Sequence, residues 1–241
     1  MSFSDLSRSL AKHNPQLYKL WFHWHCFRTG RNKHLPSKGD QLYFDGFPRS
    51  GNTYLTAGIQ AVFPELRFAN HLHAVAPIKI ALRTGLPTFI LLRKPDDAVV
   101  SYMLHVKSPI TESSKKGLGE DDLGDLLLTE WSDYYRWVRN VASQVKVILS
   151  EKAFSNPASV AELVAAELGL GLAGSHIDRC WRHFHESFKD RDQTKPQGST
   201  SFPSEIRESQ KAVIRQKLCA NERLPECLEI YHELCKVAAN G

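Results

Sequence analysis

The stretch FDGFPRSGNTYL, residues 44–55, carries the frame G-x-x-x-x-G-x-[ST] between Gly46 and Thr53. Residues 41–45, QLYFD, predict a short buried strand before this loop, and residues 52–63 predict a helix after it. Glycines in such a loop let successive N–H groups turn toward one anionic group, which the positive end of the following helix also attracts. The stretch therefore predicts an α/β fold with a phosphate-binding loop, although a tight Gly/Pro surface turn would explain the loop taken alone.

The rest of the chain continues this alternation of apolar runs and longer amphipathic segments. Further strands are predicted at residues 88–92 and 145–149, and helices at residues 15–28, 74–83, 96–105, 122–141 and 157–168. Strands that alternate with helices form a parallel sheet flanked by helices. Two polar stretches, 109–124 and 189–203, predict loops. Because no repeat or linker divides the sequence, we expect a single domain over residues 1–241, with a helical N-terminal segment (1–38) and an α/β core (39–241).

Composition and charge narrow the classes of partner. Lys and Arg number 31 against 26 Asp and Glu, and the net charge of +5 suits an anionic ligand but is too small to indicate nucleic acid. The five cysteines include no C-x-x-C pair, so neither a disulfide framework nor a zinc site is expected. No apolar run is long enough to span a membrane, and residues 1–12 lack the apolar stretch of a signal peptide, so we expect a cytoplasmic protein.

The excess of positive charge lies near the N-terminus. Residues 1–38 contain one acidic side chain, Asp5, and seven cationic ones: Arg8, Lys12, Lys19, Arg28, Arg31, Lys33 and Lys38. Contact with an anionic membrane is compatible with this charge, but a solvated basic helix face is the simpler interpretation, so no membrane contact is predicted. An apolar series at helical spacing predicts an aromatic face that packs as a lid or cap: Leu17, Leu20, Trp21, Trp24 and Phe27.

The phosphate-binding loop differs from that of a nucleotide kinase at one informative position. Asn52 stands where the kinase loop carries the lysine that reaches the terminal phosphates, and the cation lies earlier, at Arg49. An arginine inside the loop places a donor fork beside a shorter phosphate group and can stabilise a bridging oxygen as its bond breaks. A P-loop small-molecule kinase that uses ATP and magnesium is therefore the less favoured alternative.

Residues 44–55 resemble the 5′-phosphosulfate loop of the sulfotransferases that use 3′-phosphoadenosine 5′-phosphosulfate (PAPS), a loop written along the lines of P-K-S-G-T-T-W. The resemblance implies a P-loop-containing nucleotide hydrolase-like (sulfotransferase) fold. It places Arg49 at the catalytic lysine position and Tyr54 at an aromatic position near the adenine. The implied phosphate cradle consists of Ser50, Gly51, Asn52 and Thr53. The chain departs from the family pattern at Arg49, Asn52 and Tyr54.

A second segment resembles the same family. Residues 93–101, RKPDDAVVS, are similar to the family's 3′-phosphate segment R-[ND]-P-x-D-x-x-x-S, and Arg93 and Ser101 keep the family's separation. Arg93 follows a predicted strand and Ser101 lies two turns into the next predicted helix, so both can converge on one phosphate. An ion pair of Arg93 with Asp96 or Asp97 is the structural alternative.

Histidine is the side chain best suited to remove the proton of an acceptor, because its ordinary pKa lies near neutral pH. His71, followed by Leu72, stands where the family carries the catalytic histidine of a K-T-H-L-P segment, so the resemblance implies His71 as the base. His73 is the reserve choice, and a carboxylate such as Glu65 is a further alternative. Ala69 replaces the lysine of the family segment.

Further positions match the family less completely. An aromatic group on the helix at residues 122–141 fits either an acceptor pocket or the core: Trp131, Tyr134, Tyr135 and Trp137. Ser187 and Phe188 resemble a pair that lies near the adenine ring in the family. Residues 195–198, which start with Lys195, partly resemble the family's basic, glycine-rich C-terminal loop.

The resemblance implies that a sulfuryl group moves from PAPS to a hydroxyl or amine and that 3′,5′-adenosine bisphosphate leaves. Arg49 and the loop amides would stabilise the leaving phosphate, His71 would take the acceptor proton, and no metal ion is required. The acceptor, small or lipid-linked, and the oligomeric state are not indicated, although the aromatic N-terminal helix favours an apolar acceptor. A nucleotide-binding scaffold without catalysis stays open, because Ala69, His73 and Tyr54 depart from the family pattern.

Overall fold

The computed structural model describes residues 11–30, 34–108, 114–193 and 205–240. Its centre is a sheet of four parallel strands: β1 (Leu42–Gly46), β2 (Phe68–Asn70), β3 (Thr88–Leu92) and β4 (Lys146–Leu149). The strands lie in the order β2-β1-β3-β4, and Phe44 of β1 lies opposite Phe89 of β3. Because the strands are parallel, their carboxyl ends meet at one edge of the sheet.

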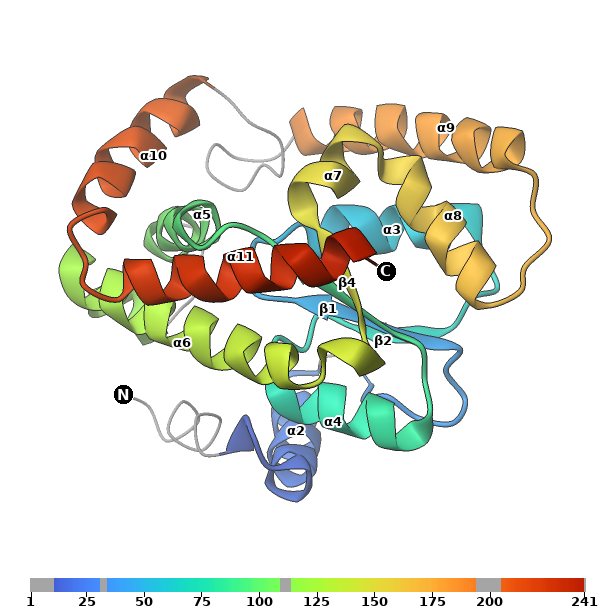
Figure 1. Cartoon of the computed structure of the whole chain (residues 1–241), viewed down its shortest axis with the longest axis horizontal. Coiled ribbons are helices and arrows are strands. Elements are labelled where there is room, and N and C mark those ends of the chain that lie inside the picture. Colours follow the sequence, from blue (N-terminus) through green and yellow to red (C-terminus); the bar gives the residue numbers. More distant parts are fainter. Residues whose placement is uncertain (1–10, 31–33, 109–113, 194–204, 241) are drawn as a thin grey trace.

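Helices connect the strands and cover both faces of the sheet. In chain order they are α2 (Pro15–Thr29), α3 (Asn52–Val62), α4 (Val75–Thr84), α5 (Pro95–Lys107), α6 (Glu120–Asn140), α7 (Ser150–Ser155), α8 (Pro157–Glu167), α9 (Gly174–Gln193), α10 (Glu205–Leu218) and α11 (Leu224–Asn240). In Figure 1, α3, α7, α8 and α9 lie above the sheet, and α4 and α6 lie below it. None of the helices in these described ranges is long and apolar enough to cross a membrane. The expected α/β fold, one domain with a parallel sheet flanked by helices, is confirmed.

Two hydrophobic cores lie on opposite faces of the sheet, because successive side chains of a strand alternate between its faces. Tyr43 of β1 belongs to the core shared with α4, α5, α6 and α11, whereas its neighbours Leu42 and Phe44 belong to the core shared with α3, α8 and α9. All five residues of β1 and of β3 are buried. These strands are therefore covered on both faces, as is usual for central strands of a parallel sheet.

The predicted strands and helices agree with the structure to within two residues at each end, but the two predicted loops are partly wrong. Residues 120–124 begin α6, where the acidic side chains of Glu120, Asp121 and Asp122 favour a helix N-terminus. Residues 189–193 continue α9. Residues 109–113 and 194–203 lie outside the described residues, and β2, α7 and α9–α11 have no counterpart in the prediction.

Helix α2 lies where it is predicted, but the face expected to pack on the protein is mostly exposed. The exposed fractions are 49% for Leu17, 71% for Leu20, 40% for Trp24 and 91% for Phe27. The helix packs instead through Tyr18 and Phe22, which are buried, with Trp21 beside them. The prediction failed because α2 carries two apolar faces, and only the second offers the Tyr18 hydroxyl a buried partner, the carbonyl oxygen of Leu72.

Candidate active site

The candidate site lies where the carboxyl ends of β1 and β3 separate. From β1 the chain passes through α3 to β2 on one side, whereas β3 lies on the other side of β1. Ligands of open α/β sheets bind at such topological switch points. A Cβ on Gly46 would lie 2.6 Å from the carbonyl oxygen of Leu91, so glycine is needed for β1 and β3 to approach this closely.

The loop after β1 turns through two residues with positive φ. The angle is 70° at Arg49 and 102° at Gly51, and the Ser50 N–H donates to the Phe47 carbonyl oxygen at 3.1 Å. A left-handed backbone is natural for glycine but strained for arginine. A Cβ on Gly51 would also lie 2.4 Å from Cζ of Phe154. Backbone strain of this kind persists only where the surroundings hold it, and it concentrates at functional sites.

Buried side chains hold this loop in place. The Tyr135 hydroxyl of α6 accepts from the Phe47 N–H at 3.2 Å and donates to the Leu91 carbonyl oxygen, and Ser150 Oγ donates to the Ser50 carbonyl oxygen at 2.8 Å. Burial raises the pKa of Tyr135, which keeps its hydroxyl a donor. The sequence predicts an aromatic cluster here but not this positioning role, because a contact between residues 88 positions apart leaves no local pattern.

Asn52 closes the loop from inside. Its Nδ2 donates to the carbonyl oxygens of Phe47 at 3.2 Å and Gly46 at 3.4 Å, so the side chain turns back into the loop. A kinase lysine would instead extend from this position toward the terminal phosphates. No side-chain hydrogen bond in the described part of the chain caps the start of α3 at Gly51. The first N–H groups and the positive end of α3 are therefore available to an anion.

The structure brings together the three predicted phosphate-binding residues Arg49, Arg93 and Ser101. Arg93 follows β3 and donates from Nη1 to the Arg49 carbonyl oxygen at 2.7 Å. Arg49 donates from Nε to Ser101 Oγ on α5 at 3.3 Å. Both arginines are half-buried and Ser101 is buried. Two arginines and a hydroxyl thus lie near one another at the end of β3, an arrangement suited to binding the phosphates of a ligand.

The alternative role of Arg93, an ion pair with Asp96 or Asp97, is wrong. Both carboxylates face Arg215 of α10, and Asp96 also contacts Lys94 at 3.4 Å. In the described ranges Arg93 forms no ion pair with a carboxylate, so its charge is available to a ligand.

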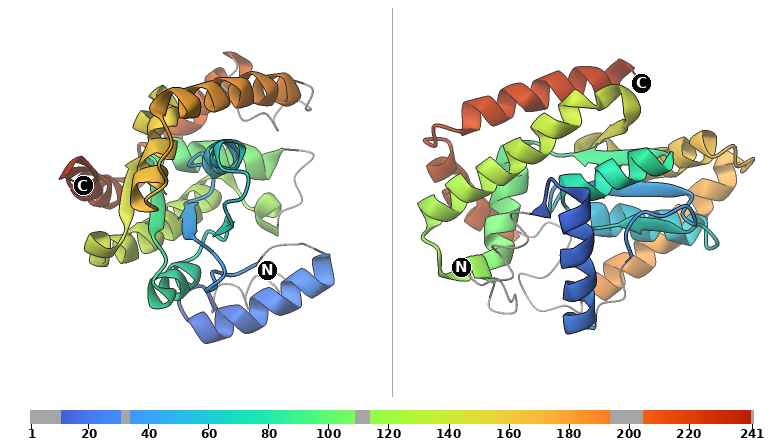
Figure 2. Two further views of the ribbon diagram at one scale, coloured as in Figure 1. Left: turned by 90° about the vertical axis from the view of Figure 1, so that its right-hand side faces the viewer. Right: turned by 90° about the horizontal axis from the view of Figure 1, so that it is seen from below.

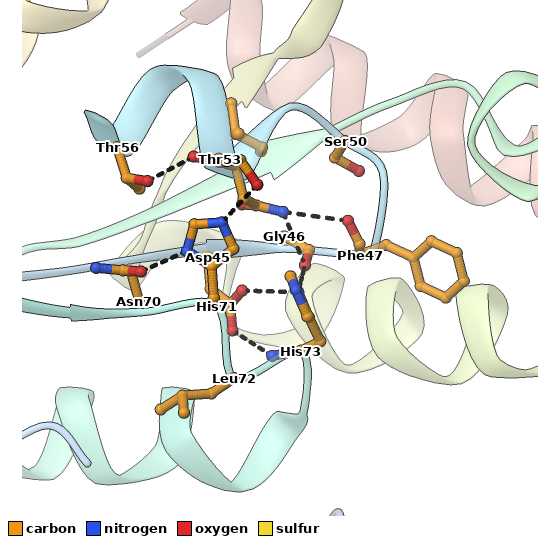
Figure 3. A network of polar contacts seen from close by, with 12 residues as sticks. Asp45, Gly46, Phe47, Ser50, Thr53, Thr56, Asn70, His71, Leu72 and His73 are labelled. Atoms are coloured by element: carbon orange, nitrogen blue, oxygen red, sulfur yellow. Dashed lines mark hydrogen bonds and ion pairs between the residues drawn. The ribbon is translucent and has the colours of Figure 1, made fainter. Parts of the chain in front are cut away.

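The loop after β2 holds two histidines in a strained conformation, with φ of 57° at His71 and 50° at His73. His71 contacts Asn70 Oδ1 through Nδ1 and the exposed Thr53 hydroxyl through Nε2 at 3.1 Å (Figure 3). Because an amide oxygen only accepts, Nδ1 carries the proton and Nε2 presents its lone pair at the mouth of the loop. This tautomer is the one that a general base needs.

His73 is tied to the buried carboxylate of Asp45. Its N–H donates to Asp45 Oδ2 at 2.7 Å, and its ring Nδ1 donates to the Gly46 carbonyl oxygen at 2.7 Å and lies 3.1 Å from Asp45 Oδ1 (Figure 3). The Tyr43 hydroxyl donates to the same carboxylate at 2.5 Å. Burial alone would raise the pKa of Asp45, but His73 and these hydrogen bonds lower it, so Asp45 stays ionised. The network fixes the β2–α4 loop to the end of β1.

Tyr54 joins α3 to α9 through a cluster of aromatic rings. Its buried ring lies 5.4 Å from that of Phe188, and its hydroxyl contacts His185 Nδ1 at 2.7 Å. The predicted residues Tyr54 and Phe188 therefore meet, with Ser187 next to Phe188 on α9. Phe154 of α7 is 45% exposed and packs beside Tyr54 and Gly51, a contact that no sequence signal indicated.

Several candidates do not join this edge of the sheet. Glu65 lies in the exposed turn before β2, at the opposite edge where the parallel strands begin, so it is wrong as a candidate base. Trp131 and Tyr134 are core residues, Trp137 packs against the core, and Lys195 lies outside the described residues. Among the residues that the structure describes, no group of three or more His, Cys, Asp or Glu side chains could hold a metal ion.

The arrangement of strands and helices is the fold of the sulfotransferases. The chain is similar to the crystal structure of mouse sulfotransferase SULT7A1 complexed with PAP, with a TM-score of 0.51 and 13% sequence identity over 86% of this chain and 91% of that chain. No family model and no curated protein matches the sequence. The likeness therefore shows a sulfotransferase-like fold.

Proposed function

We propose that this protein is a sulfotransferase that moves a sulfuryl group from PAPS to a hydroxyl or amine acceptor and releases 3′,5′-adenosine bisphosphate. The observation that carries the proposal is the convergence of Arg49, Arg93 and Ser101 beside the loop after β1. A donor with phosphates at two ends needs two anion sites, and the chain offers one at the start of α3 and one between Arg93 and Ser101. The PAP named with the mouse structure supports this choice of nucleotide.

The residues of the loop fit a diphosphate-like donor better than a triphosphate. Asn52 turns inward, so the loop lacks the extended lysine of a kinase. Arg49 lies within the loop, where its guanidinium can stabilise charge that develops on the leaving phosphate. The loop N–H groups bind the same phosphate, and Ser50, Gly51, Asn52 and Thr53 form the cradle. Tyr54 and Phe188 lie behind it as the aromatic wall on the adenine side.

His71 is the proposed base. Its Nε2 faces the loop mouth at Thr53, and an acceptor hydroxyl or amine that replaces the Thr53 contact would donate its proton to that nitrogen. His73 holds the loop through Asp45 and Gly46 and serves as a positioning residue. The acceptor is a small molecule or a lipid-linked group, and no metal ion takes part.

Transfer from radiolabelled PAPS to a panel of phenols, sterols, sugars and glycolipids tests this proposal with Arg49→Ala as the variant. We expect turnover at saturating donor to fall about 100-fold or more, because the variant loses the donor fork at the leaving phosphate. Arg83→Ala is the matched control, since Arg83 is exposed on α4, away from the loop. Donor binding without transfer to any acceptor would instead support a nucleotide-binding scaffold, and ATP-dependent transfer would support a kinase.

A further inference from the structure

Helix α2 presents a row of apolar side chains to solvent. The outer stripe consists of Leu17, Leu20, Trp24 and Phe27, spaced so that they follow one line along the helix. Leu20 is 71% exposed and Phe27 is 91% exposed. Figure 2 shows α2 at the border of the molecule, with its outer side away from the sheet. Exposed apolar side chains that form one continuous row, rather than scattered single residues, indicate a surface that binds a partner.

The outer stripe belongs to a helix that is fixed on the protein. Asn14 Oδ1 accepts from the N–H groups of Gln16 at 2.9 Å and Leu17 at 3.2 Å, which caps the start of α2, and Gly30 ends it with a φ of 62°. Tyr18 and Phe22 anchor the opposite face in the core. The exposure of the outer stripe is therefore built into the fold and is not the result of a detached helix.

Basic side chains border the outer stripe on both sides. At about 100° per residue, His23 lies along one side with Lys19 further round the same side, and Arg28 lies along the other. The Arg28 guanidinium lies 5.4 Å from the centre of the Trp24 ring, so cation and aromatic ring share one surface. Helix α2 contains no acidic residue. Apolar side chains that include Trp and Phe, bordered by cations, are typical of helices that lie in the interface of an anionic membrane.

We propose that α2 docks the protein on an anionic lipid bilayer, with the outer stripe in the interface and Lys19 and Arg28 beside the headgroups. The positive charge of α2 is complementary to anionic headgroups, which favours a bilayer over a second copy of the chain. A second copy of the chain would bring the same cations face to face without an acid on either α2. The long stems of Lys19 and Arg28 allow their charges to reach headgroups while the outer stripe enters the apolar layer.

Docking would place the candidate base close to the bilayer. The Tyr18 hydroxyl on the inner face of α2 donates to the carbonyl oxygen of Leu72, between His71 and His73, at 3.2 Å. The thickness of one helix, about 10 Å, thus separates the outer stripe from the histidine loop. An acceptor group carried at a lipid surface would have the shortest path to this loop. The docking itself does not depend on the reaction proposed above.

Co-sedimentation of the full chain with lipid vesicles tests the docking without donor or acceptor, so its failure is separate from failure of the proposed reaction. We expect the protein to bind vesicles of phosphatidylcholine and phosphatidylglycerol at least about tenfold more strongly than vesicles of phosphatidylcholine alone, with added salt reducing the difference. The Leu20→Ser/Phe27→Ser variant should bind the anionic vesicles at least about tenfold more weakly.

Val213→Ser is the matched control, because Val213 is 60% exposed on α10, away from α2, and should leave binding unchanged. Lys19→Gln/Arg28→Gln should lose the preference for anionic vesicles. Circular dichroism would show that each variant is folded. Absence of binding by the unaltered protein, or equal binding by Leu20→Ser/Phe27→Ser, would overturn the proposal. Size-exclusion chromatography tests the alternative that the outer stripe binds a second copy of the chain. A dimer that the Leu20→Ser/Phe27→Ser variant dissociates, together with no vesicle binding, would assign the outer stripe to that second copy.

Discussion

Arg49, His71 and His73 share a backbone feature with consequences for the site. In the described part of the chain they are the residues other than glycine with positive φ. Each follows the carboxyl end of a strand, and each is a candidate catalytic residue in the sequence analysis. A left-handed backbone costs about 1 kcal/mol or more for such a residue, so contacts such as those of Asp45 and Arg93 must hold it. The strained residues thus include the two proposed to act in the chemical step, Arg49 and His71, and all three lie at one edge of the sheet. This supports a single site at that edge.

The assignment of the base predicts a change in the pH–rate profile. Transfer should rise with pH as the base loses its proton, and His71→Ala should lower turnover about 100-fold or more and remove that rise. His73→Ala is the matched comparison, because His73 lies in the same loop but is tied to Asp45 and Gly46. It should lower turnover while the rise remains. An unchanged profile in His71→Ala, or loss of the rise only in His73→Ala, would reject His71 as the base.

At the level of residues, the sequence predicts the polar side chains of the proposed phosphate site but not the residues that support them. Arg49, Arg93 and Ser101 lie in short motifs with fixed spacing, and the structure brings them together. Tyr135 and Phe154 act on the same loop from distant segments, and a contact of that kind has no local sequence pattern. The supports of the loop are therefore visible only in the folded chain.

At the level of elements, the sequence predicts the strands β1, β3 and β4 and misses the shorter strand β2. Most residues of β1 and β3 are apolar, whereas β2 has three residues, too few to show an alternating pattern. The orientation of α2 could not be predicted either, because a helix with two apolar faces gives no single direction for packing. Its Tyr18 hydroxyl, bound to Leu72, decides which face turns inward.

The contact of α3 with α9 predicts the effect of Gly58→Ala on stability. A Cβ on Gly58 would lie 2.3 Å from Cη2 of the buried Trp181 ring, which cannot turn aside without disturbing Tyr54. We expect the free energy of unfolding to fall by about 2 kcal/mol, measured by denaturant titration. Gly171→Ala is the matched control, since nothing lies within 4 Å of its Cβ position, and it should leave stability nearly unchanged. Equal stability of both variants would contradict the packing described here.

At the level of the whole molecule, a buried ion cluster connects the N-terminal segment to the core. Glu130 of α6 contacts Lys12 at 2.7 Å and Lys115 at 2.5 Å, with all three side chains mostly buried. Burial alone would raise the pKa of Glu130, but attraction to the two lysines outweighs it and lowers that pKa. A carboxyl whose pKa is lower in the folded state stabilises the protein above its unfolded pKa, and that stabilisation disappears as pH falls through the folded pKa.

Glu130→Gln should therefore lower the free energy of unfolding at neutral pH by about 2 kcal/mol. The difference from the unaltered protein should shrink as pH falls below the ordinary glutamate pKa of about 4, because the unfolded chain then binds a proton at Glu130 that the folded state does not. Urea titrations at a series of pH values measure both effects. Glu162→Gln is the control, because Glu162 lies on α8 and takes no part in this cluster. A difference that stays constant with pH would show that the cluster does not act through the charge of Glu130.

The fold as a whole follows from the alternation of strands and helices, and the likeness to the mouse sulfotransferase confirms it at 13% identity. The fold alone does not say which ligand binds at the carboxyl ends of β1 and β3. We propose that Arg93 and the loop after β1 bind a donor with a 3′-phosphate. Calorimetric titration with 3′,5′-adenosine bisphosphate in the absence of magnesium tests that claim, with ATP and 5′-AMP as competing ligands and Arg83→Ala as the control. We expect binding that requires the 3′-phosphate and weakens about 30-fold in Arg93→Ala. Tighter binding of ATP, or equal binding by Arg93→Ala, would contradict it.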